Sequence, residues 1–286
     1  GLANINRNEN LLQGLREGII SGKSKSEGGV TEEDLINNIN YNKYLYDNDI
    51  KPLNNIYQMT GINFLYRVLS ELMPYLAAVV VLLLCSDCFA SEVDWGSYKF
   101  LLLQPYPRGK FFTAKVLSCL VVALTVLGSS LLIVFVIMSV LNGTGSAKYP
   151  IAFDPNAFSS FAVTQKSEIL VYLGASRFLL YAFILFALYI VFLTTFACLS
   201  SVLSQESLNA MTASISVTFA AAVLQSPISR MTYFSLFWPF SYGNAVTVMA
   251  GDAAGSMLAG FIVLISVSVL LVSISRIIFI KKDIIC

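Results

Sequence analysis

Residues 92–115 read EVDWGSYKFLLLQPYPRGKFFTAK and separate two long apolar runs of the chain. The stretch holds acidic and basic side chains, and each would cost about 2.5–3.5 kcal/mol at the centre of a bilayer on insertion scales. It therefore belongs at a membrane face. Its apolar part, residues 98–103, is too short to span a membrane and too apolar for a solvated loop. We expect a short helix that lies along the interface and offers one side to a partner.

The composition indicates a membrane protein. Hydrophobic residues make up 56% of the 286 residues and charged residues only 12%, whereas soluble domains carry about 25% charged residues. The net charge of +1 gives no case for a basic nucleic-acid-binding face. The chain has no histidine, which excludes histidine-based triads and HExxH metalloprotease chemistry. Cys85 and Cys88 have a metal-like spacing, but without histidine or a second such pair we expect no metal site.

The apolar runs predict an all-α multi-pass membrane protein with five transmembrane helices in this chain. We expect these helices at residues 72–89, 116–141, 170–199, 208–224 and 257–280. Residues 1–70 are polar and rich in Asn, and we expect them to form a helical segment separate from the membrane domain of residues 71–286. The SGKS at residues 21–24 lacks the preceding Gly of a nucleotide-binding loop, so we expect no ATP binding by this chain.

Seven residues of the first stretch form an ordered pattern: Glu92, Gly96, Lys99, Leu101, Leu102, Pro105 and Arg108. The pattern resembles E-x(3)-G-T-x-K-x-L-L-x-x-P-x-S-R, the cytoplasmic loop of ABC-2 type permeases, which are the membrane subunits of ABC exporters. Ser97 replaces the usual Thr here, and Pro107 replaces the usual Ser. The resemblance implies that the loop at residues 90–115 is a coupling helix that docks into an ATP-binding subunit. A generic membrane loop with basic ends is the alternative interpretation.

The pattern and the resemblance assign roles to single residues. Coupling to the ATP-binding subunit is expected from Glu92, Gly96, Tyr98, Lys99, Phe100, Leu101, Leu102, Pro105 and Arg108. We expect Glu92 to cap the short helix or to pair with Lys99 or Arg108. A place at the membrane interface is expected for Lys110, Lys115, Arg177, Trp238, Lys281 and Lys282. Small hydroxyl residues allow membrane helices to pack closely. We expect this role, with the lining of a substrate path as a second interpretation, for Thr212, Ser214, Ser216 and Thr218.

The distribution of basic residues predicts the orientation. Lys and Arg are concentrated in the loop at 87–115 and at the C-terminal end, so the positive-inside rule places both in the cytoplasm. Five helices that end inside begin outside, which puts residues 1–70 on the external face. We therefore predict a multi-pass protein of the cell membrane, and we expect this to be a bacterial plasma membrane. The family resemblance implies a further N-terminal transmembrane helix ahead of this chain.

The loop at residues 225–255 precedes the last predicted helix and is crowded with Tyr, Phe and Trp. Aromatic side chains at this density are typical of a membrane–water interface. The resemblance to ABC-2 permeases implies instead a short re-entrant helical pair. Both interpretations remain open at this point.

The central parts of the second, fourth and fifth predicted helices carry no ionisable residue, and the third has only Arg177 near one end. Ion-coupled carriers need such groups, so we expect the energy to come from a partner. The predicted function is the permease subunit of an ATP-driven exporter for a hydrophobic, amphipathic or peptide substrate. The expected assembly has a second permease subunit, the same or related, and two ATP-binding subunits. Those ATP-binding subunits would hold ATP and Mg, with no cofactor and no enzymatic activity in this chain. The alternative is a non-transport sensor or scaffold that binds a ligand through its external segment.

Overall fold

The computed structural model describes residues 2–16, 32–50, 59–96, 107–159, 170–229, 231–253 and 255–281. Five of its helices are long and apolar enough to cross a membrane: Gly61–Asp94, Arg108–Asn142, Ala175–Leu203, Ser207–Gln225 and Met257–Lys281. A hydrocarbon core of ~30 Å needs about 20 helical residues. Four of the helices are longer than this, and the fourth helix, with 19 residues, nearly reaches it. The predicted all-α multi-pass membrane fold is therefore confirmed.

The first long helix begins at Gly61, well before the predicted residue 72. It consists of four pieces, α3 (Gly61–Arg67), η2 (Val68–Leu72), α4 (Met73–Cys85) and α5 (Ala90–Asp94). The helix starts earlier because Leu65, Val68 and Leu69 are buried in the main core. In the sequence these apolar residues lie at the end of a polar segment, so they did not predict a membrane helix. Gly61 allows the start of this helix to pack closely against α7, because a Cβ atom at this position would collide with the hydroxyl of Ser139 on α7.

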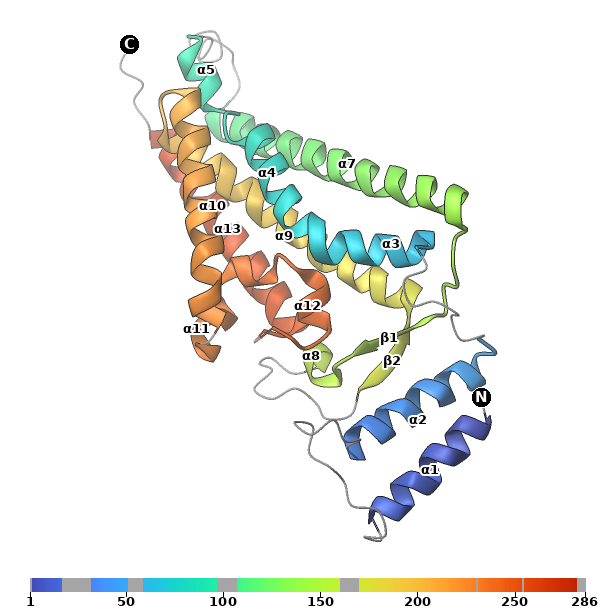
Figure 1. Ribbon diagram of the computed structural model, residues 1–286. Helices are drawn as coiled ribbons and strands as arrows, with labels where there is room; N and C mark the ends of the chain where they lie inside the picture. The colour runs from blue at the N-terminus through green and yellow to red at the C-terminus, as the bar shows by residue number, and fades with distance from the viewer. Residues whose placement is uncertain are drawn as a thin grey trace.

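Helix α9 (Ala175–Leu203) is the central element of the bundle. In Figure 1 it runs between α7 (Arg108–Asn142) on one side and α10 (Ser207–Ser229) and α13 (Met257–Lys281) on the other. Buried residues make up 61% of its most apolar window, against 17% for α7 and 17% for α10. The outer helices therefore present broad apolar faces that lipid or another subunit must cover.

The loop between α10 and α13 folds back into the bundle. It contains α11 (Thr232–Phe237), η3 (Pro239–Tyr242) and α12 (Ala245–Met249). Tyr242 is 1% exposed, and its hydroxyl donates a 2.6 Å hydrogen bond to the carbonyl oxygen of Leu236. Val248 and Met249 belong to the same core as the long helices. Three aromatic side chains on α11 are instead exposed, Tyr233, Phe234 and Phe237, whereas Ser235 and Leu236 are buried. The loop therefore combines an inserted part with an outward-facing aromatic part.

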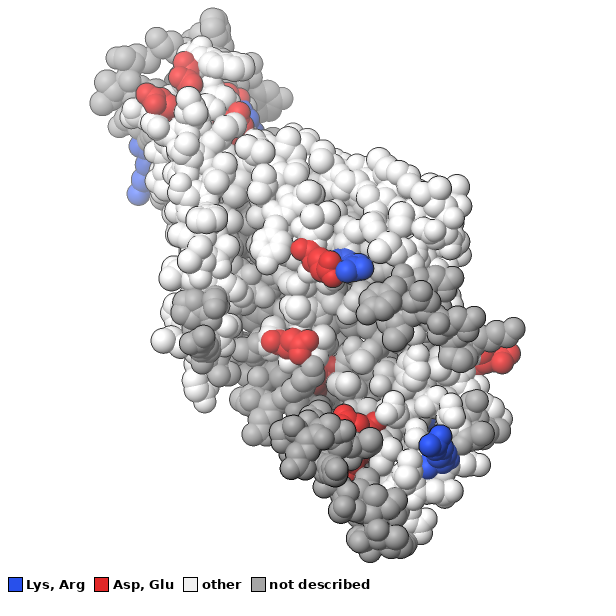
Figure 2. Space-filling model, in the orientation of Figure 1, with Lys and Arg blue, Asp and Glu red and all other residues white. Residues whose placement is uncertain are grey.

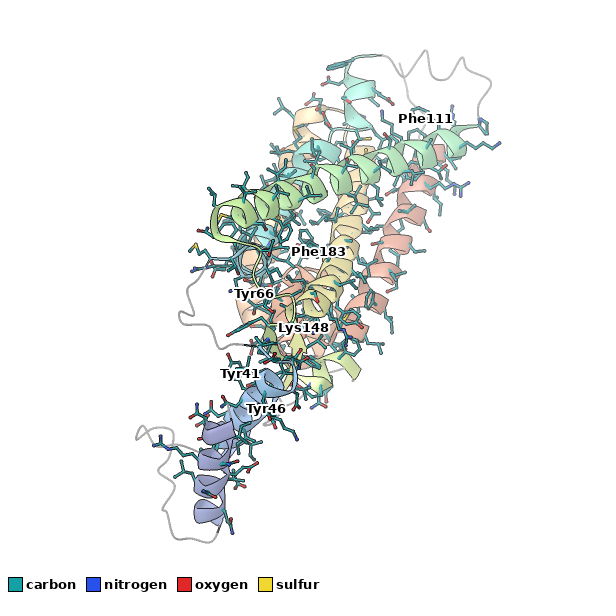
Figure 3. The ribbon with its side chains drawn as sticks, turned by 90° about the vertical axis from the view of Figure 1, so that its right-hand side faces the viewer. Tyr41, Tyr46, Tyr66, Phe111, Lys148 and Phe183 are labelled. Atoms are coloured by element: carbon teal, nitrogen blue, oxygen red, sulfur yellow. The ribbon has the colours of Figure 1, made fainter. Side chains whose placement is uncertain are left out.

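The opposite end of the bundle from α5 carries a two-stranded antiparallel hairpin, called here the hairpin end. Strand β1 (Pro150–Phe153) pairs with β2 (Val171–Gly174), and α8 (Pro155–Ser159) follows β1. Two further helices pack against each other beside it, α1 (Leu2–Arg16) and α2 (Glu32–Asp47). The hydroxyls of Tyr41 on α2 and Tyr149 lie 2.9 Å apart, and the backbone N–H of Leu170 donates to the side-chain oxygen of Asn37. Figure 3 shows Tyr41 and Lys148 near this junction and Phe111 close to the other end.

The charged side chains are unevenly distributed along the molecule. Figure 2 shows one group at the end that carries α5, an uncharged band below it, and further charged side chains from the middle of the visible face to the opposite end. Arg67 and Glu71 form an exposed ion pair early in the first long helix, with 3.2 Å between Nε and Oε1. That helix has 34 residues, more than a bilayer core needs, so its first turns extend beyond the hydrocarbon region.

Candidate functional site

Two features of the bundle concern function: a junction at the α5 end and a cavity in the half nearer the hairpin. The α5 junction is defined here as Phe89, Glu92, Phe112, Lys115, Ser201 and Phe279. It lies at the end of the bundle where α5 ends and α7 begins (Figure 1). The residues between these two helices, 97–106, lie outside the part of the chain that the structure describes.

An ion pair joins α5 to α7. The ammonium of Lys115 donates a hydrogen bond to a carboxylate oxygen of Glu92, and both side chains are 21% exposed. The same ammonium lies 5.6 Å from the ring centroid of Phe89 and 5.7 Å from that of Phe111, within cation–π range. The sequence-based partners of Glu92 were Lys99, which lies outside the described residues, and Arg108; the ion pair that the structure describes is with Lys115. Lys115 follows the buried Phe112 by three positions and shares its face of α7.

Three phenylalanine rings from three helices pack around this ion pair. The ring centroids of Phe89 and Phe112 are 5.3 Å apart, those of Phe89 and Phe279 are 5.3 Å apart, and those of Phe112 and Phe279 are 5.6 Å apart. Phe112 is 0% exposed, and the cluster also contains Val116, Cys198 and Val202. Such aromatic contacts add about 0.5–1.5 kcal/mol each beyond area burial, so the start of α5, the start of α7 and the end of α13 form one packed unit.

A hydroxyl from α9 fixes the start of α5. The Oγ atom of Ser201 accepts hydrogen bonds from the backbone N–H of Phe89 at 2.8 Å and of Ala90 at 3.0 Å. The first N–H groups of a helix have no partner within it, so Ser201 supplies from another helix what an N-cap residue normally supplies. Helix α9 therefore holds α5 in place.

Thiols lie beside the junction. The structure describes four free cysteines: Cys85, Cys88, Cys119 and Cys198. The Sγ of Cys119 on α7 lies 2.9 Å from the Sγ of Cys88, in the turn between α4 and α5. No group of three or more potential ligands suited to a metal ion occurs among the described residues. The sulfur atoms of Cys88 and Cys119 form another close contact between α7 and the turn before α5.

The structure describes three of the residues predicted to couple. Glu92 lies in the junction, and Gly96 ends α5 with a φ of 68°, a left-handed conformation that favours glycine. Arg108 begins α7, and its guanidinium donates to the carbonyl oxygen of Ile280 at 3.4 Å. The others lie outside the described residues: Tyr98, Lys99, Phe100, Leu101, Leu102 and Pro105.

The residues predicted to lie at the membrane interface have different surroundings. Lys110, Arg177 and Lys281 are exposed, near the ends of α7, α9 and α13. Lys115 forms the ion pair with Glu92 in the α5 junction. Trp238 is partly buried and stacks on Phe234, with 5.8 Å between ring centroids. Lys282 lies outside the described residues.

The second feature, called here the lateral cavity, has a volume of about 520 Å³ and lies between α4, α9, α10 and the folded-back loop. This size falls in the range of about 300–1,000 Å³ that is usual for ligand pockets. Two of its lining residues are strongly exposed, Tyr75 on α4 at 71% and Phe219 on α10 at 70%. The cavity therefore opens between α4 and α10, on the apolar side of the bundle.

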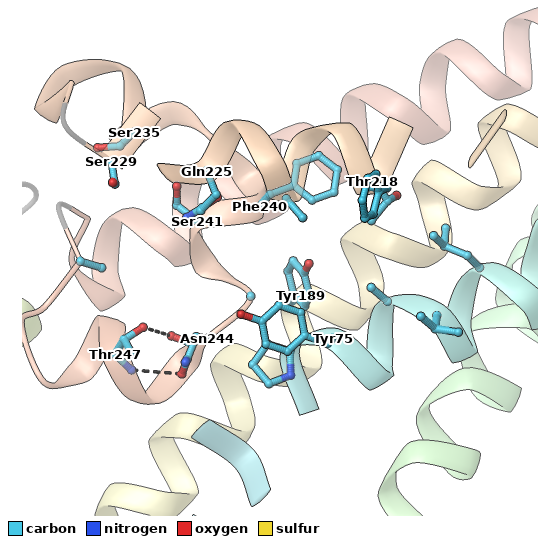
Figure 4. Close-up of a pocket in the computed structure, with 18 of the residues that line it drawn as sticks. Tyr75, Tyr189, Thr218, Gln225, Ser229, Ser235, Phe240, Ser241, Asn244 and Thr247 are labelled. Carbon is cyan, nitrogen blue, oxygen red and sulfur yellow. Dashed lines mark hydrogen bonds between the residues drawn. The ribbon is translucent and has the colours of Figure 1, made fainter. Parts of the chain in front are cut away.

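Polar groups line the wall formed by α10 and the folded-back loop. Figure 4 shows Gln225 and Ser241 close together, with Tyr75 and Tyr189 grouped on another side. Asn244 is fixed by two hydrogen bonds, donating to the carbonyl oxygen of Ser70 at 2.7 Å and accepting from the N–H of Thr247 at 3.2 Å. Sequence reasoning missed these residues, because they meet only when the loop folds back.

One of the four hydroxyl residues predicted on α10 lines the cavity, and this is Thr218. Ser214 is buried and donates to the carbonyl oxygen of Met211 within its own helix. Thr212 and Ser216 are exposed on α10, and neither is among the lining residues. The period of the helix explains this difference in exposure. Residues four apart share a face, so Thr212 and Ser216 lie on one face and Ser214 and Thr218 on another.

Five long apolar helices, with a charged loop after the first and a folded-back loop before the last, define this chain as a multi-pass membrane protein. A family model described as ABC-2 family transporter protein matches residues 17–283. The chain therefore belongs to the ABC-2 transporter family and is a permease subunit of an ABC transporter. Membership implies association with an ABC ATP-binding subunit. Comparison with curated proteins gives no match.

Proposed function

We propose that this permease subunit exports an apolar or amphipathic substrate, driven by ATP that a separate subunit binds with Mg²⁺ and hydrolyses. The α5 junction is the observation that carries the proposal. Residues 97–106 connect α5 to α7 in sequence, and by the family resemblance they include the surface that docks into the ATP-binding subunit. A push on these residues acts first on α5 and on the start of α7.

The contacts of the junction support transmission of that push into the bundle. Glu92 and Lys115 connect α5 to α7, Ser201 connects α5 to α9, and the ring of Phe279 connects the cluster to α13. Packed elements respond to such a displacement as rigid bodies, because dense cores do not deform continuously. Movement of α5 would therefore rotate or shift several long helices together.

The charges at the two ends support a cytoplasmic α5 end. Arg108 and Lys110 open α7, and Arg276 and Lys281 lie in the last turns of α13 beside them. Cytoplasmic ends of transmembrane helices carry an excess of such residues. This orientation places the C-terminus in the cytoplasm and α1 and α2 on the external face of the cell membrane.

The outer face of α10 supports a second permease subunit. Only 17% of the apolar window of this helix is buried, and Thr212 and Ser216 lie on its exposed surface. Small hydroxyl residues on a membrane helix allow a neighbouring helix to approach closely. Two such subunits, identical or related, would enclose the pathway that one subunit leaves open.

Transport by the reconstituted complex tests the proposal. The chain and its ATP-binding subunit are placed in proteoliposomes and assayed with a panel of amphipathic peptides and drugs. We expect uptake of at least one compound with ATP and Mg²⁺, and no uptake with a non-hydrolysable ATP analogue. Uptake that is equal with the analogue would contradict ATP-driven export. So would a lack of uptake of every compound to which cells are resistant only when the chain is present.

A sensor or scaffold is a second candidate, favoured by a groove at the hairpin end. This groove has a volume of about 300 Å³ and lies between α2 and β2, lined by Lys43, Asp47 and Tyr172 among others. The two opposite charges and the tyrosine could bind a polar ligand. Binding of an external ligand to a variant that has lost transport but kept a cellular response would favour this candidate over export.

A further inference from the structure

We propose that Asn244 is a positioning residue for transport, which links the folded-back loop to a break in the first long helix. This inference rests on the proposed export function and says how a push at the α5 junction reaches the loop. It is carried by two observations. A proline removes a hydrogen-bond donor from the helix, and the side chain of Asn244 replaces that donor from the loop.

The first long helix is irregular where η2 is followed by α4. In a regular α-helix the N–H of residue 74 would donate to the carbonyl oxygen of Ser70, but Pro74 has no N–H. Just before it, the N–H of Met73 donates to the carbonyl oxygen of Val68, in the pattern of a π-helix. Figure 1 shows α3 and α4 running in different directions on the two sides of this break. The carbonyl oxygen of Ser70 therefore loses its regular helical donor.

The side chain of Asn244 supplies a donor from the folded-back loop. Its Nδ2 donates to the carbonyl oxygen of Ser70 at 2.7 Å, and its Oδ1 accepts from the backbone N–H of Thr247 at 3.2 Å. The hydroxyl of Thr247 donates in turn to the backbone carbonyl oxygen of Asn244 at 2.9 Å, and Figure 4 shows both bonds between these two residues. Proline is tolerated in membrane helices where a neighbouring group bonds the freed carbonyl oxygen, and Asn244 is that group here.

The loop side of this link is firmly packed. Helix α12 begins directly after Asn244, and it packs against η2 and α9. Four of its residues are buried and belong to the main core: Ala245, Val246, Val248 and Met249. Because densely packed elements move as rigid bodies, a displacement of Asn244 moves α12 with it.

Helix α4 connects the break to the α5 junction. A push at the junction therefore reaches Ser70 along one helix, and the bond to Asn244 passes it on to α12. The same elements form two walls of the lateral cavity, with Pro74 and Tyr75 from α4 and Asn244 and Thr247 from the loop. While the bond holds, these two walls move together, and the cavity changes its width at the wall formed by α10.

Three variants separate the link from the local bonds of Asn244. Asn244→Ser keeps a side-chain oxygen that can cap α12 but is too short to reach Ser70. Ser70→Ala is the matched control, because it removes only a hydroxyl that donates to the carbonyl oxygen of Arg67 in the same helix. The double variant Asn244→Ser with Pro74→Ala gives the carbonyl oxygen of Ser70 an N–H donor within the helix and leaves the loop unlinked.

The test measures the distance between α4 and the loop in the complex with the ATP-binding subunit, in nanodiscs. Spin labels are attached to keto amino acids introduced at Leu76 on α4 and at Phe237 in the loop, so the native cysteines stay unlabelled. Both positions are exposed. The distance is measured by electron double resonance, without nucleotide and after trapping with ATP and vanadate.

We expect nucleotide trapping to leave this distance constant in wild type and in Ser70→Ala. In Asn244→Ser and in the double variant it should change by about 2 Å, the size of common helix shifts in switching proteins. A distance that changes equally in wild type and Asn244→Ser, or that stays constant in both, would overturn the proposal.

Transport per ATP hydrolysed, measured in proteoliposomes, is the second measurement. We expect it to be at least about twofold lower in Asn244→Ser and in the double variant, and unchanged in Ser70→Ala. Recovery of transport in the double variant would show that the bond only satisfies a carbonyl oxygen, and it would overturn the role of the link.

Failure of this inference can be told apart from failure of the export proposal. The distance measurement needs nucleotide trapping but no transported substrate, so a complex with an Asn244-dependent distance and no ATP-driven uptake contradicts export alone. A complex that exports with ATP, and in which Asn244→Ser changes neither the distance nor transport, contradicts the link alone.

Discussion

Lys115 on α7 forms an ion pair with Glu92 on α5, across the two ends of the stretch at residues 97–106. Both side chains are only 21% exposed, so the pair lies largely away from water. The helix before the stretch is thereby tied to the helix after it. A partner that presses on the stretch acts on both helices together, which is the mechanical basis of the proposed coupling.

Removal of the cation should weaken this tie. In Lys115→Met the carboxylate of Glu92 loses its ammonium partner, and a charged hydrogen bond of this kind is worth about 1.5–3 kcal/mol. We expect lower thermal stability in nanodiscs and a larger fall in transport than in ATP hydrolysis. The exchanged pair Glu92→Lys with Lys115→Glu should recover part of the transport. An exchanged pair as defective as Lys115→Met would show that the ion pair itself has no role.

The hydroxyl of Ser201 offers a sharper test of how α9 holds α5. Ser201→Ala removes the acceptor of two backbone N–H groups, and loss of such a cap costs about 0.5–2 kcal/mol. Ser200→Ala is the matched control, because the hydroxyl of Ser200 bonds only carbonyl oxygens of its own helix. We expect a lower unfolding temperature and reduced transport for Ser201→Ala. Equal effects of both variants would contradict the assigned role.

The contact between Cys88 and Cys119 allows the junction to be locked. Their sulfur atoms are 2.9 Å apart, so little movement is needed to form a disulfide when copper phenanthroline and dioxygen remove the two thiol protons and two electrons. If α5 must move relative to α7, oxidation should stop transport and dithiothreitol should restore it. The control Cys119→Ser should be insensitive to the oxidant. Full transport by a protein shown to be cross-linked would contradict movement at this point.

Alkaline pH should weaken the docking of α2 on the hairpin end. Burial and the hydrogen bond with Tyr41 raise the pKa of Tyr149 above the ordinary value of about 10. The phenol therefore loses its proton more readily when α2 is undocked, and docking is strongest below pH ~10 and weakens above it. Spin-label distances between α2 and β2 should increase in this range, and Tyr149→Phe should reduce the change. Distances that stay constant up to the unfolding pH would contradict this account.

The sequence predicts the long helices well because a membrane span depends on composition alone. The predicted helix at 257–280 corresponds closely to α13 (Met257–Lys281), since every residue of such a helix must be apolar or able to bond internally. The start of the first helix was placed too late, because Arg67 and Glu71 interrupt the apolar run in sequence while pairing with each other on the helix surface. Local hydropathy does not record such a pairing.

The site could be predicted only where it is local. The pattern of Glu92 and Arg108 marks the loop, but the contacts of the junction join residues far apart, as with Phe89 and Ser201. Likewise, Thr218 was suggested by its hydroxyl, whereas Gln225 and Ser241 line one cavity only because the loop after α10 folds back. Contacts between residues so far apart in the sequence depend on tertiary packing. The hydrophobic periodicity of a single sequence predicts helices but does not predict such contacts.

The central claim is that the stretch leaving the α5 junction docks into an ATP-binding subunit. Its most direct test is the ATP hydrolysis that co-purifies with the tagged chain from solubilised membranes. Leu101→Asp places a charge in the predicted docking surface, and Leu11→Asp places one on α1 as the control. We predict that wild type and Leu11→Asp retain the ATP-binding subunit and its activity, and that Leu101→Asp inserts normally but loses both. Full co-purified ATP hydrolysis with Leu101→Asp would contradict the account.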